Sequence, residues 1–187
     1  MSPTRPDITH ERKDHTMGLV IRKTQNLNDL FQNQLNTLYG LETESLDTLN
    51  KMAGAATSPA VRKELEAAAA ETRTHATRLD EVFKAIGSKP DSMRCGCVDG
   101  LLRDCRDAAD SDAEINVRDA SLVAMAQAIQ QNEIARYQAA HGWASSLKQD
   151  KAGTLLKQTI DEETASSSRL AALATTVNES AVHKVLA

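Results

Sequence analysis

The chain contains 187 residues, and its composition is that of an all-α protein. Aromatic residues make up 3% of the sequence and Gly is scarce, while Ala, Leu, Glu, Gln, Lys and Arg dominate the middle of the chain, as they do in long packed helices. The net charge of −4 excludes a globally basic surface for nucleic acid or an anionic membrane. No apolar run reaches the roughly 20 residues of a membrane span, so we expect a soluble protein without a membrane partner.

Residues 1–23 are predicted to form a disordered tail, because they contain two prolines and lack a helical period. Five basic and three acidic residues give this tail a charge of +2. Such an arm could touch DNA or an acidic protein partner, and a solvated extension without a partner is the simpler alternative. Nucleic-acid binding is the least supported of these readings.

The first predicted helix spans residues 26–54. Asn26 is a suitable N-cap with Asp29 three residues later, and Gly54 is a suitable residue just beyond the helix end. Glu42 interrupts its apolar stripe, which consists of Leu27, Leu30, Phe31, Leu35, Leu38, Leu46 and Leu49.

The second predicted helix begins after Ser58, with Pro59 at its first position, and stops at Gly87. Thr72 and His75 lie in the middle of its apolar stripe. Residues 88–112 then break the pattern and contain one short amphipathic helix around Leu101, Leu102 and Cys105.

The pattern Ser111-x-x-Glu114 is a capping box, and it predicts the start of the next long helix. That helix carries Glu133 and Tyr137 on or beside its inner stripe and ends near Lys148. Asp150 is expected to cap the last long helix, which places Glu163 on its inner face, and residues 178–187 are expected to fray.

Connection lengths predict a ferritin-like four-helix bundle over residues 24–177, with one long crossover that contains a short extra helix. Tight turns at 54–58 and 148–150 make two antiparallel hairpins, and the segment 88–112 is long enough to cross the bundle. Glu42, His75, Glu133 and Glu163 lie 12 to 17 residues from those turns. At about 1.5 Å per residue they could share one layer.

Four ionisable side chains at one depth indicate a site, because an unpaired buried charge costs several kcal/mol. Ferritin-like di-metal centres take one Glu from each of two helices and a Glu-x-x-His from each of the other two. This chain offers Glu42, Thr72-x-x-His75, Glu133 and Glu163-x-x-Ser166, and Glu71 or Glu162 could turn inward to complete the set. The candidate metal ligands are Glu42, Glu71, His75, Glu133, Glu162 and Glu163.

Oxygen-rich ligands with a little imidazole suit iron or manganese. Tyr39 and Tyr137 lie one turn from Glu42 and Glu133, where they could hydrogen-bond ligating carboxylates. The alternative is a buried polar network that binds no metal and serves fold specificity.

Several spaced runs of residues resemble the YciF/YciE family of bacterial ferritin-like stress proteins, over about residues 26–176. These runs are Leu30-Phe31, Leu38-Tyr39-x-x-Glu42, Glu71-Thr72, Arg78-Leu79-x-x-Val82-Phe83, Cys95 with Gly100-Leu101, Val117-Arg118-Asp119-Ala120, Glu133-Ile134-Ala135-x-Tyr137 and Leu155-Leu156-Lys157-Gln158-Thr159. The resemblance implies a homodimeric bundle, induction by stress and a di-iron carboxylate centre.

The chain also departs from that family. Ala70, Gln130 and Ser167 stand where relatives usually carry acidic residues, Gln131 stands where they carry His, and His75 replaces an amide. The family's site is therefore thinned out and partly rebuilt.

Cys95, Cys97 and Cys105 form the other notable group. Their odd number argues against a disulfide framework and favours the reducing cytoplasm. Three thiols could hold a soft metal, but a closed zinc site takes four ligands. We interpret Cys95 and Cys105 as small core residues and Cys97 as incidental.

The favoured functional hypothesis is protection from oxidative stress through an iron or manganese site with ferroxidase- or catalase-like redox of oxygen or peroxide. The alternative is a non-enzymatic helical scaffold or assembly protein.

Overall fold

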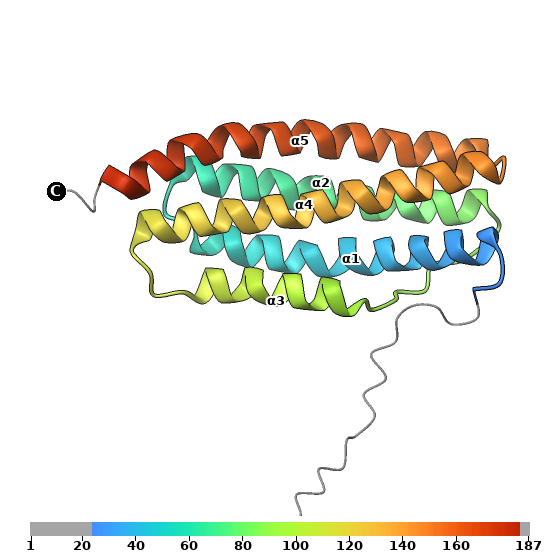
Figure 1. The fold of residues 1–187 in the computed structure, drawn as a ribbon, viewed down its shortest axis with the longest axis horizontal. Helices are drawn as coiled ribbons and strands as arrows, with labels where there is room; N and C mark the ends of the chain where they lie inside the picture. Colours follow the sequence, from blue (N-terminus) through green and yellow to red (C-terminus); the bar gives the residue numbers. More distant parts are fainter. Residues whose placement is uncertain (1–23, 184–187) are drawn as a thin grey trace, which may run out of the picture.

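The computed structural model describes residues 24–183, which form five helices in an antiparallel bundle. The helices are α1 (Leu27–Ala55), α2 (Pro59–Ala85), α3 (Gly96–Asp110), α4 (Ile115–Ser146) and α5 (Asp150–His183). Helices α1 and α2 form one hairpin and α4 and α5 the other, while the shorter α3 lies along the edge of the bundle beside α1 (Figure 1). The ferritin-like arrangement of two hairpins and one long crossover is confirmed. The predicted tail, residues 1–23, lies outside the described residues.

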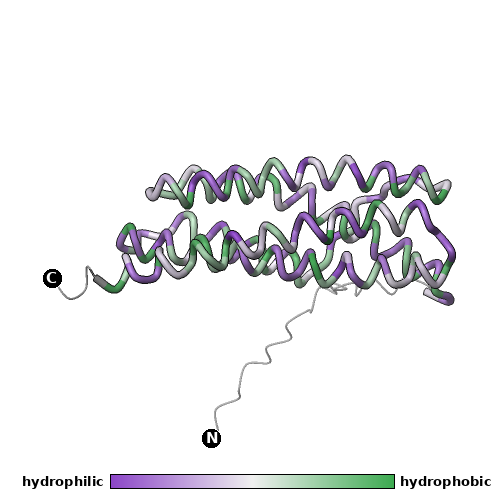
Figure 2. The backbone as a smooth tube through the Cα atoms, turned by 90° about the horizontal axis from the view of Figure 1, so that it is seen from above, coloured by the Kyte–Doolittle hydropathy of each residue, from purple (hydrophilic) through white to green (hydrophobic). Residues whose placement is uncertain are grey.

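Hydrophobic and hydrophilic residues are interspersed along the helices (Figure 2). Within residues 24–183, no helix is long and apolar enough to cross a bilayer. Leu27 and Leu30, expected on the buried stripe of α1, are instead 37% and 36% exposed, and both lie in the first turn of that helix.

The turn between α1 and α2 is held by a residue from the other hairpin. Asn26 caps α1 as predicted, accepting a hydrogen bond from the amide of Asp29. Gly54, however, lies inside α1 rather than beyond its end. Ser58 precedes α2 but its side chain makes no cap. Instead the buried carboxylate of Asp119, on α4, accepts hydrogen bonds from the amides of Thr57 and Ser58 at 2.9 and 2.7 Å, which satisfies N–H groups that a helix start leaves open.

The crossover is seated on α1. Gly87 ends α2 with a φ of 70°, as the sequence predicted. The amide of Met93 donates to the carbonyl of Asn36, and the amide of Asp91 donates to the Asn36 side chain. A Cβ atom on Gly40 would stand 2.9 Å from the Met93 carbonyl oxygen, so this close approach requires glycine.

Two predicted helix starts are displaced. Helix α4 begins at Ile115 and is capped by Glu114, whose carboxylate accepts from the amides of Asn116 and Val117, so Ser111 is not its N-cap. Asp150 is the first residue of α5 rather than its cap. Helix α5 also continues to His183, beyond the predicted onset of fraying at 178.

The core consists of two apolar clusters with a polar layer between them. One cluster includes Leu49, Leu65, Ile129 and Leu170, and the other includes Phe31, Leu38, Phe83, Tyr137 and Ile160. In each long helix a buried ionisable residue stands between the two clusters, namely Glu42, His75, Glu133 and Glu163. The fold thus places these residues at mid-height, sealed from water on both sides.

Candidate metal centre

Three of the predicted ligands converge. One ligand atom from each of Glu42, His75 and Glu163 can be chosen so that all three lie within 4.8 Å of one another. All three side chains are almost completely buried, and Glu133 is buried beside them with 3% exposure. The inward stripe of each helix positions its residue, since each replaces an apolar side chain at a core position.

His75 is oriented by contacts at both ring nitrogens. Its Nε2 lies 2.9 Å from Glu162 Oε2, and its Nδ1 lies 2.9 Å from Glu163 Oε1 and 3.9 Å from Glu42 Oε1. The Nδ1 contact is at ion-pair distance but lacks hydrogen-bond geometry. The ring therefore presents one nitrogen to Glu162 and the other to the cluster.

Glu162 does not point into the cluster. Arg78 binds it through two hydrogen bonds of 2.7 and 2.9 Å, and the Gln158 amide adds a third at 3.0 Å. Arg78 is itself buried and donates to Thr159 at 2.8 Å. Glu162 acts on His75 from outside, in the carboxylate–histidine arrangement that fixes a ligand's ring in metal sites. Helical periodicity did not assign Arg78 a role, although its position one turn after His75 on a buried stripe was a usable signal.

Tyr137 orients Glu42. Its hydroxyl donates a 2.6 Å hydrogen bond to Glu42 Oε1, while Glu42 Oε2 has no partner among the described residues. Tyr137 thus bonds a candidate ligand as predicted. Tyr39 does not, because its ring packs edge-on against Phe83, with ring centroids 6.2 Å apart.

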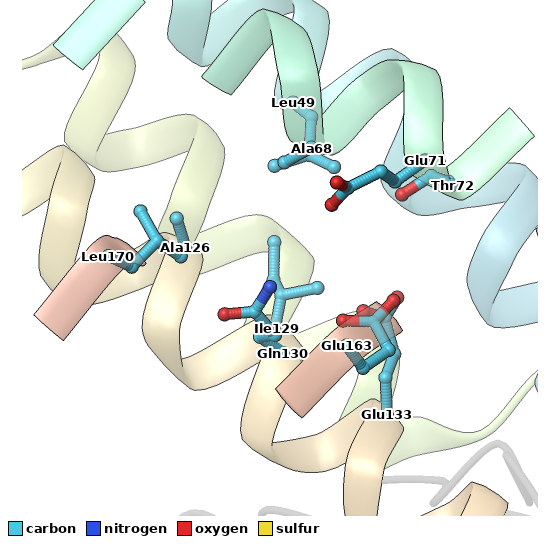
Figure 3. Close-up of a pocket in the computed structure, with 10 residues that line it drawn as sticks. All are labelled: Leu49, Ala68, Glu71, Thr72, Ala126, Ile129, Gln130, Glu133, Glu163 and Leu170. Atoms are coloured by element: carbon cyan, nitrogen blue, oxygen red, sulfur yellow. The ribbon is translucent and has the colours of Figure 1, made fainter. Parts of the chain in front are cut away.

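A small pocket adjoins Glu133. It is lined by Leu49, Ala68, Glu71, Thr72, Ala126, Ile129, Gln130, Glu133, Glu163 and Leu170, and Figure 3 shows Glu71 across it from the neighbouring carboxylates of Glu133 and Glu163. Oε1 of Glu133 and Oε1 of Gln130 have no hydrogen-bond partner among the described residues. Buried acceptors without a donor are costly, so this side of the layer is suited to a cation or a water molecule.

Glu71 is engaged elsewhere. Arg169 binds both of its carboxylate oxygens at 2.8 and 3.0 Å, and Arg169 also donates to Ser166 and Glu64. Ser166 and Thr72, the residues at the Glu-x-x-His positions, are buried but offer only hydroxyl groups. Of the six predicted ligands, four lie at the layer and Glu71 and Glu162 are ion-paired with arginines.

Burial shifts the pKa values of the layer. Desolvation, reinforced by the nearby Glu163 charge and opposed by His75 and the Tyr137 hydrogen bond, raises the pKa of Glu42 to about 8. Desolvation and the charges of Glu42 and Glu163 raise the pKa of Glu133 well above its ordinary value. Burial by itself lowers the pKa of His75, but its contacts with Glu163, Glu42 and Glu162 raise it overall. Partial burial of Glu162 is outweighed by hydrogen bonds from Arg78, Gln158 and His75, which lower its pKa to about 2.

These groups fit a divalent metal ion. If His75 is neutral and Nε2 donates to Glu162, then Nδ1 and the oxygens of Glu42 and Glu163 are three acceptors facing one another, and only a proton or a cation can hold them together. Glu42 Oε2, Glu133 Oε1 and His75 Nδ1 are buried and have no hydrogen-bond partner within residues 24–183. Three carboxylates and one imidazole form a donor set suited to iron or manganese.

The fold and this layer define the class of protein, a ferritin-like bundle with a buried carboxylate–imidazole cluster. Residues 26–182 match the family described as a domain of unknown function, DUF892. The chain is 32% identical over 160 residues to Protein YciF of Escherichia coli strain K12, which covers 84% of this chain and 96% of that protein. The chain belongs to this YciF-like family.

Solved structures of other proteins have the same fold as this chain. The crystal structure of the E. coli stress protein YciF superposes with a TM-score of 0.80 at 30% identity, covering 83% of this chain and 98% of that one. YcfI of Rhodopseudomonas palustris, for which a structural role is suggested, gives 0.76 at 34% identity, covering 80% and 96%. A protein of Xanthomonas campestris pv. campestris shares the fold, with a TM-score of 0.70 at 15% identity over 87% of this chain and all of that one.

Proposed function

We propose that the layer formed by Glu42, His75, Glu133 and Glu163 binds one iron or manganese ion, and that the protein protects against oxidative stress by consuming oxygen or peroxide. The observation that carries this proposal is the orientation of His75. Its Nε2 is taken by Glu162, so its Nδ1 faces Glu42 and Glu163 across 3.9 and 2.9 Å. A purely structural histidine has no need of two further carboxylates at its second nitrogen.

The residues of the layer and their neighbours have different roles in metal binding. Glu42, Glu163 and His75 Nδ1 supply ligands, and Glu133 supplies a fourth through its unpartnered oxygen. Arg78 and Glu162 hold the imidazole ring in place, and the Tyr137 hydroxyl orients Glu42 and lies where it can give up a proton. The apolar clusters above and below exclude bulk water. A bound iron or manganese ion would supply electrons for the reduction of oxygen or peroxide.

The geometry favours one ion per chain rather than two. A second ion in the adjoining pocket would need Glu71, which Arg169 already neutralises, and Thr72 and Ser166 provide hydroxyls where di-metal proteins have a carboxylate and an imidazole. The ferroxidase chemistry of a two-ion centre is therefore less well supported than single-ion redox chemistry.

A non-enzymatic scaffold is the second candidate, and one observation favours it. Protonated His75 can pair with Glu163, and the raised pKa values of Glu42 and Glu133 favour the neutral form of both carboxyl groups. The layer can then be electrically balanced without any metal.

Anaerobic titration with Fe²⁺ or Mn²⁺ separates the two candidates. Wild type should bind about one ion per chain, with release of protons and a rise in melting temperature. Glu133→Gln should lose most of that binding, while Glu71→Gln, which lines the same pocket, should retain it. The manganese electron spin resonance spectrum reports the ligand environment independently of activity. Equal binding by wild type and the double variant of Glu42 and Glu133 would refute the site, and no binding by wild type would favour the scaffold.

We also infer that the chain forms a homodimer in the cytoplasm, as the family resemblance implies. Exposed apolar side chains at Leu27, Leu30, Ile115 and Val117 are available for such contacts. Sedimentation equilibrium should give twice the mass of the 20.3 kDa chain, and a monomer at micromolar concentration would contradict it.

A further inference from the structure

Two thiols are in contact where the crossover enters α3. Cys95 Sγ and Cys97 Sγ lie 3.1 Å apart, so a shift of about 1 Å would bring them to disulfide length. Cys97 is exposed and Cys95 is half-buried. Cys105, in contrast, is buried in the apolar core, and its sulfur donates a long hydrogen bond of 3.9 Å to the Met125 carbonyl. The sequence interpretation of Cys105 as a core residue is confirmed, but the interpretation of Cys97 as incidental overlooked this pairing.

Helix α4 supplies a cation to the pair. Nη2 of Arg136 lies 3.1 Å from Cys97 Sγ and 3.5 Å from Cys95 Sγ. The guanidinium is fixed by a 2.7 Å hydrogen bond from its Nε to Asn132. A positive charge shared by two thiols favours the thiolate form, which is the reactive nucleophile.

The two thiols are also unequal. Burial tends to raise the pKa of Cys95, but hydrogen bonds from Cys97 and from the amides of Val98 and Cys97, with the charge of Arg136, lower it overall. Burial and the neighbouring Cys95 raise the pKa of Cys97. This asymmetry suits Cys95 to attack and Cys97 to resolve.

The backbone holds the pair in place. The crossover is bonded to α1 through the Met93 amide and the Asn36 carbonyl, and Gly40 permits its close approach. The amides of Val98 and Asp99 both donate to the Cys95 carbonyl at the start of α3. The cluster therefore joins three elements that pack on one another, the crossover with α3, α1 and α4 (Figure 1).

We propose that Cys95 and Cys97 are a redox-active dithiol that hydroperoxides oxidise to an intramolecular disulfide. The Cys95 thiolate attacks the terminal peroxide oxygen, the O–O bond breaks, and the alkoxide leaves and takes a proton to become an alcohol. Cys97, as its thiolate, then attacks the sulfenic acid of Cys95; the S–S bond forms and hydroxide leaves and is protonated to water. Two thiols and one hydroperoxide thus give a disulfide, an alcohol and water, and a dithiol reductant restores the thiols.

Hydrogen peroxide provides the test, applied to the full chain with a chelator present. Wild type should lose two of its three thiols and the mass of two hydrogen atoms per chain, and peptide mapping should join Cys95 to Cys97. Cys105→Ser should react at the same rate, and Cys97→Ser should stop at a sulfenic acid that dimedone traps. Circular dichroism checks that each variant is folded.

The role of Arg136 gives a second readout. Arg136→Gln should slow the oxidation roughly tenfold by lowering the thiolate fraction at neutral pH, and Arg136→Lys should restore most of the rate. Glu133→Gln should leave the oxidation unchanged, which keeps this proposal distinguishable from the proposed metal function. Oxidation no faster than that of free cysteine, a disulfide between two chains, or an Arg136→Gln rate equal to wild type would each overturn the proposal.

Discussion

The two sides of the polar layer are built differently. On the side of α2 and α5, Arg78, Glu162 and Thr159 form a connected network in which the two oxygens of Glu162 accept four hydrogen bonds in all. On the side of α1 and α4, Glu42, Ser45, Gln130 and Glu133 each retain a buried polar atom that has no hydrogen-bond partner among residues 24–183, and so does His75 Nδ1, the atom of α2 that faces Glu42. Both sides are enclosed by the same apolar clusters. A satisfied network supports structure, whereas an unsatisfied one indicates where a ligand is to be received.

The largest expected effect is the pH dependence of the metal-free protein. The pKa of Glu42 rises from 4.5 to about 8 on folding, and those of Glu133 and His75 also rise. A group with a raised folded pKa stabilises the fold below its unfolded pKa and loses that contribution as pH climbs to its folded value. With a chelator present, stability should therefore fall between pH 5 and 9, by on the order of 3 kcal/mol.

The groups facing Glu42 act in known directions. His75, Tyr137 and Arg78 oppose its upward shift, and Glu163 adds to it. Thermal melts across that pH range measure the effect. A flat profile between pH 5 and 9 would mean that water reaches the layer and screens the carboxylates.

Removal of Arg78 should give the next largest effect, because it breaks the hydrogen-bonded network on the side of α2 and α5. Arg78→Met should destabilise the protein by about 2 kcal/mol and weaken metal binding roughly tenfold or more by releasing Glu162 and hence the His75 ring. Urea unfolding and metal titration measure the two effects. Arg73→Met, on an exposed position of the same helix, is the control and should change neither.

Tyr137→Phe extends the lack of hydrogen-bond donors on the α1 and α4 side, because it removes the donor to Glu42 Oε1. The 2.6 Å hydrogen bond to Glu42 Oε1 is lost, and both Glu42 oxygens are then without a hydrogen-bond donor among residues 24–183, at a cost of about 1.5 kcal/mol. The pKa of Glu42 should rise further, since this hydrogen bond lowers it. Urea unfolding at pH 7 checks the cost, and a neutral result would show that the tyrosine serves packing alone.

Glu133→Gln should have the smallest effect and the opposite sign. Replacing a carboxyl that is crowded by Glu42 and Glu163 should stabilise the metal-free protein by about 1 kcal/mol at alkaline pH. In the presence of Mn²⁺ the same variant should be less stable than wild type. Stabilisation in both conditions would point to the scaffold.

The sequence predicted the depth of the polar layer in the bundle better than the directions in which its acidic side chains point. Glu42, His75, Glu133 and Glu163 interrupt apolar stripes, and a period of 3.6 residues assigns them inward. Successive residues of a helix point in directions about 100° apart, so Glu71 and Glu162 lie on the faces next to the inward stripe. There each is bound by an arginine of the facing helix, Glu162 by Arg78 and Glu71 by Arg169. Which arginine reaches which carboxylate depends on packing between helices that are distant in sequence.

The wrong predictions of helix N-caps have a similar origin. Ser111 and Glu114 both fit the local pattern of an N-cap, and the chain uses Glu114 for α4 because Ser111 ends α3. Ser58 was correctly placed before α2, but its side chain makes no cap, and the amides of the turn before α2 are instead bonded by Asp119 from another helix. Local patterns locate a helix start to within a few residues and do not tell which element satisfies it.

The contact made by Asp119 sets the alignment of the two hairpins. Its carboxylate, on α4, is bonded to both amides and the hydroxyl of the turn that precedes α2. Sliding one hairpin along the other by a single residue, about 1.5 Å, would break all three bonds and would also carry Glu133 out of level with Glu42 and His75. Asp119 contacts no candidate ligand, yet its hydrogen bonds keep the four long helices in the register at which the candidate ligands meet.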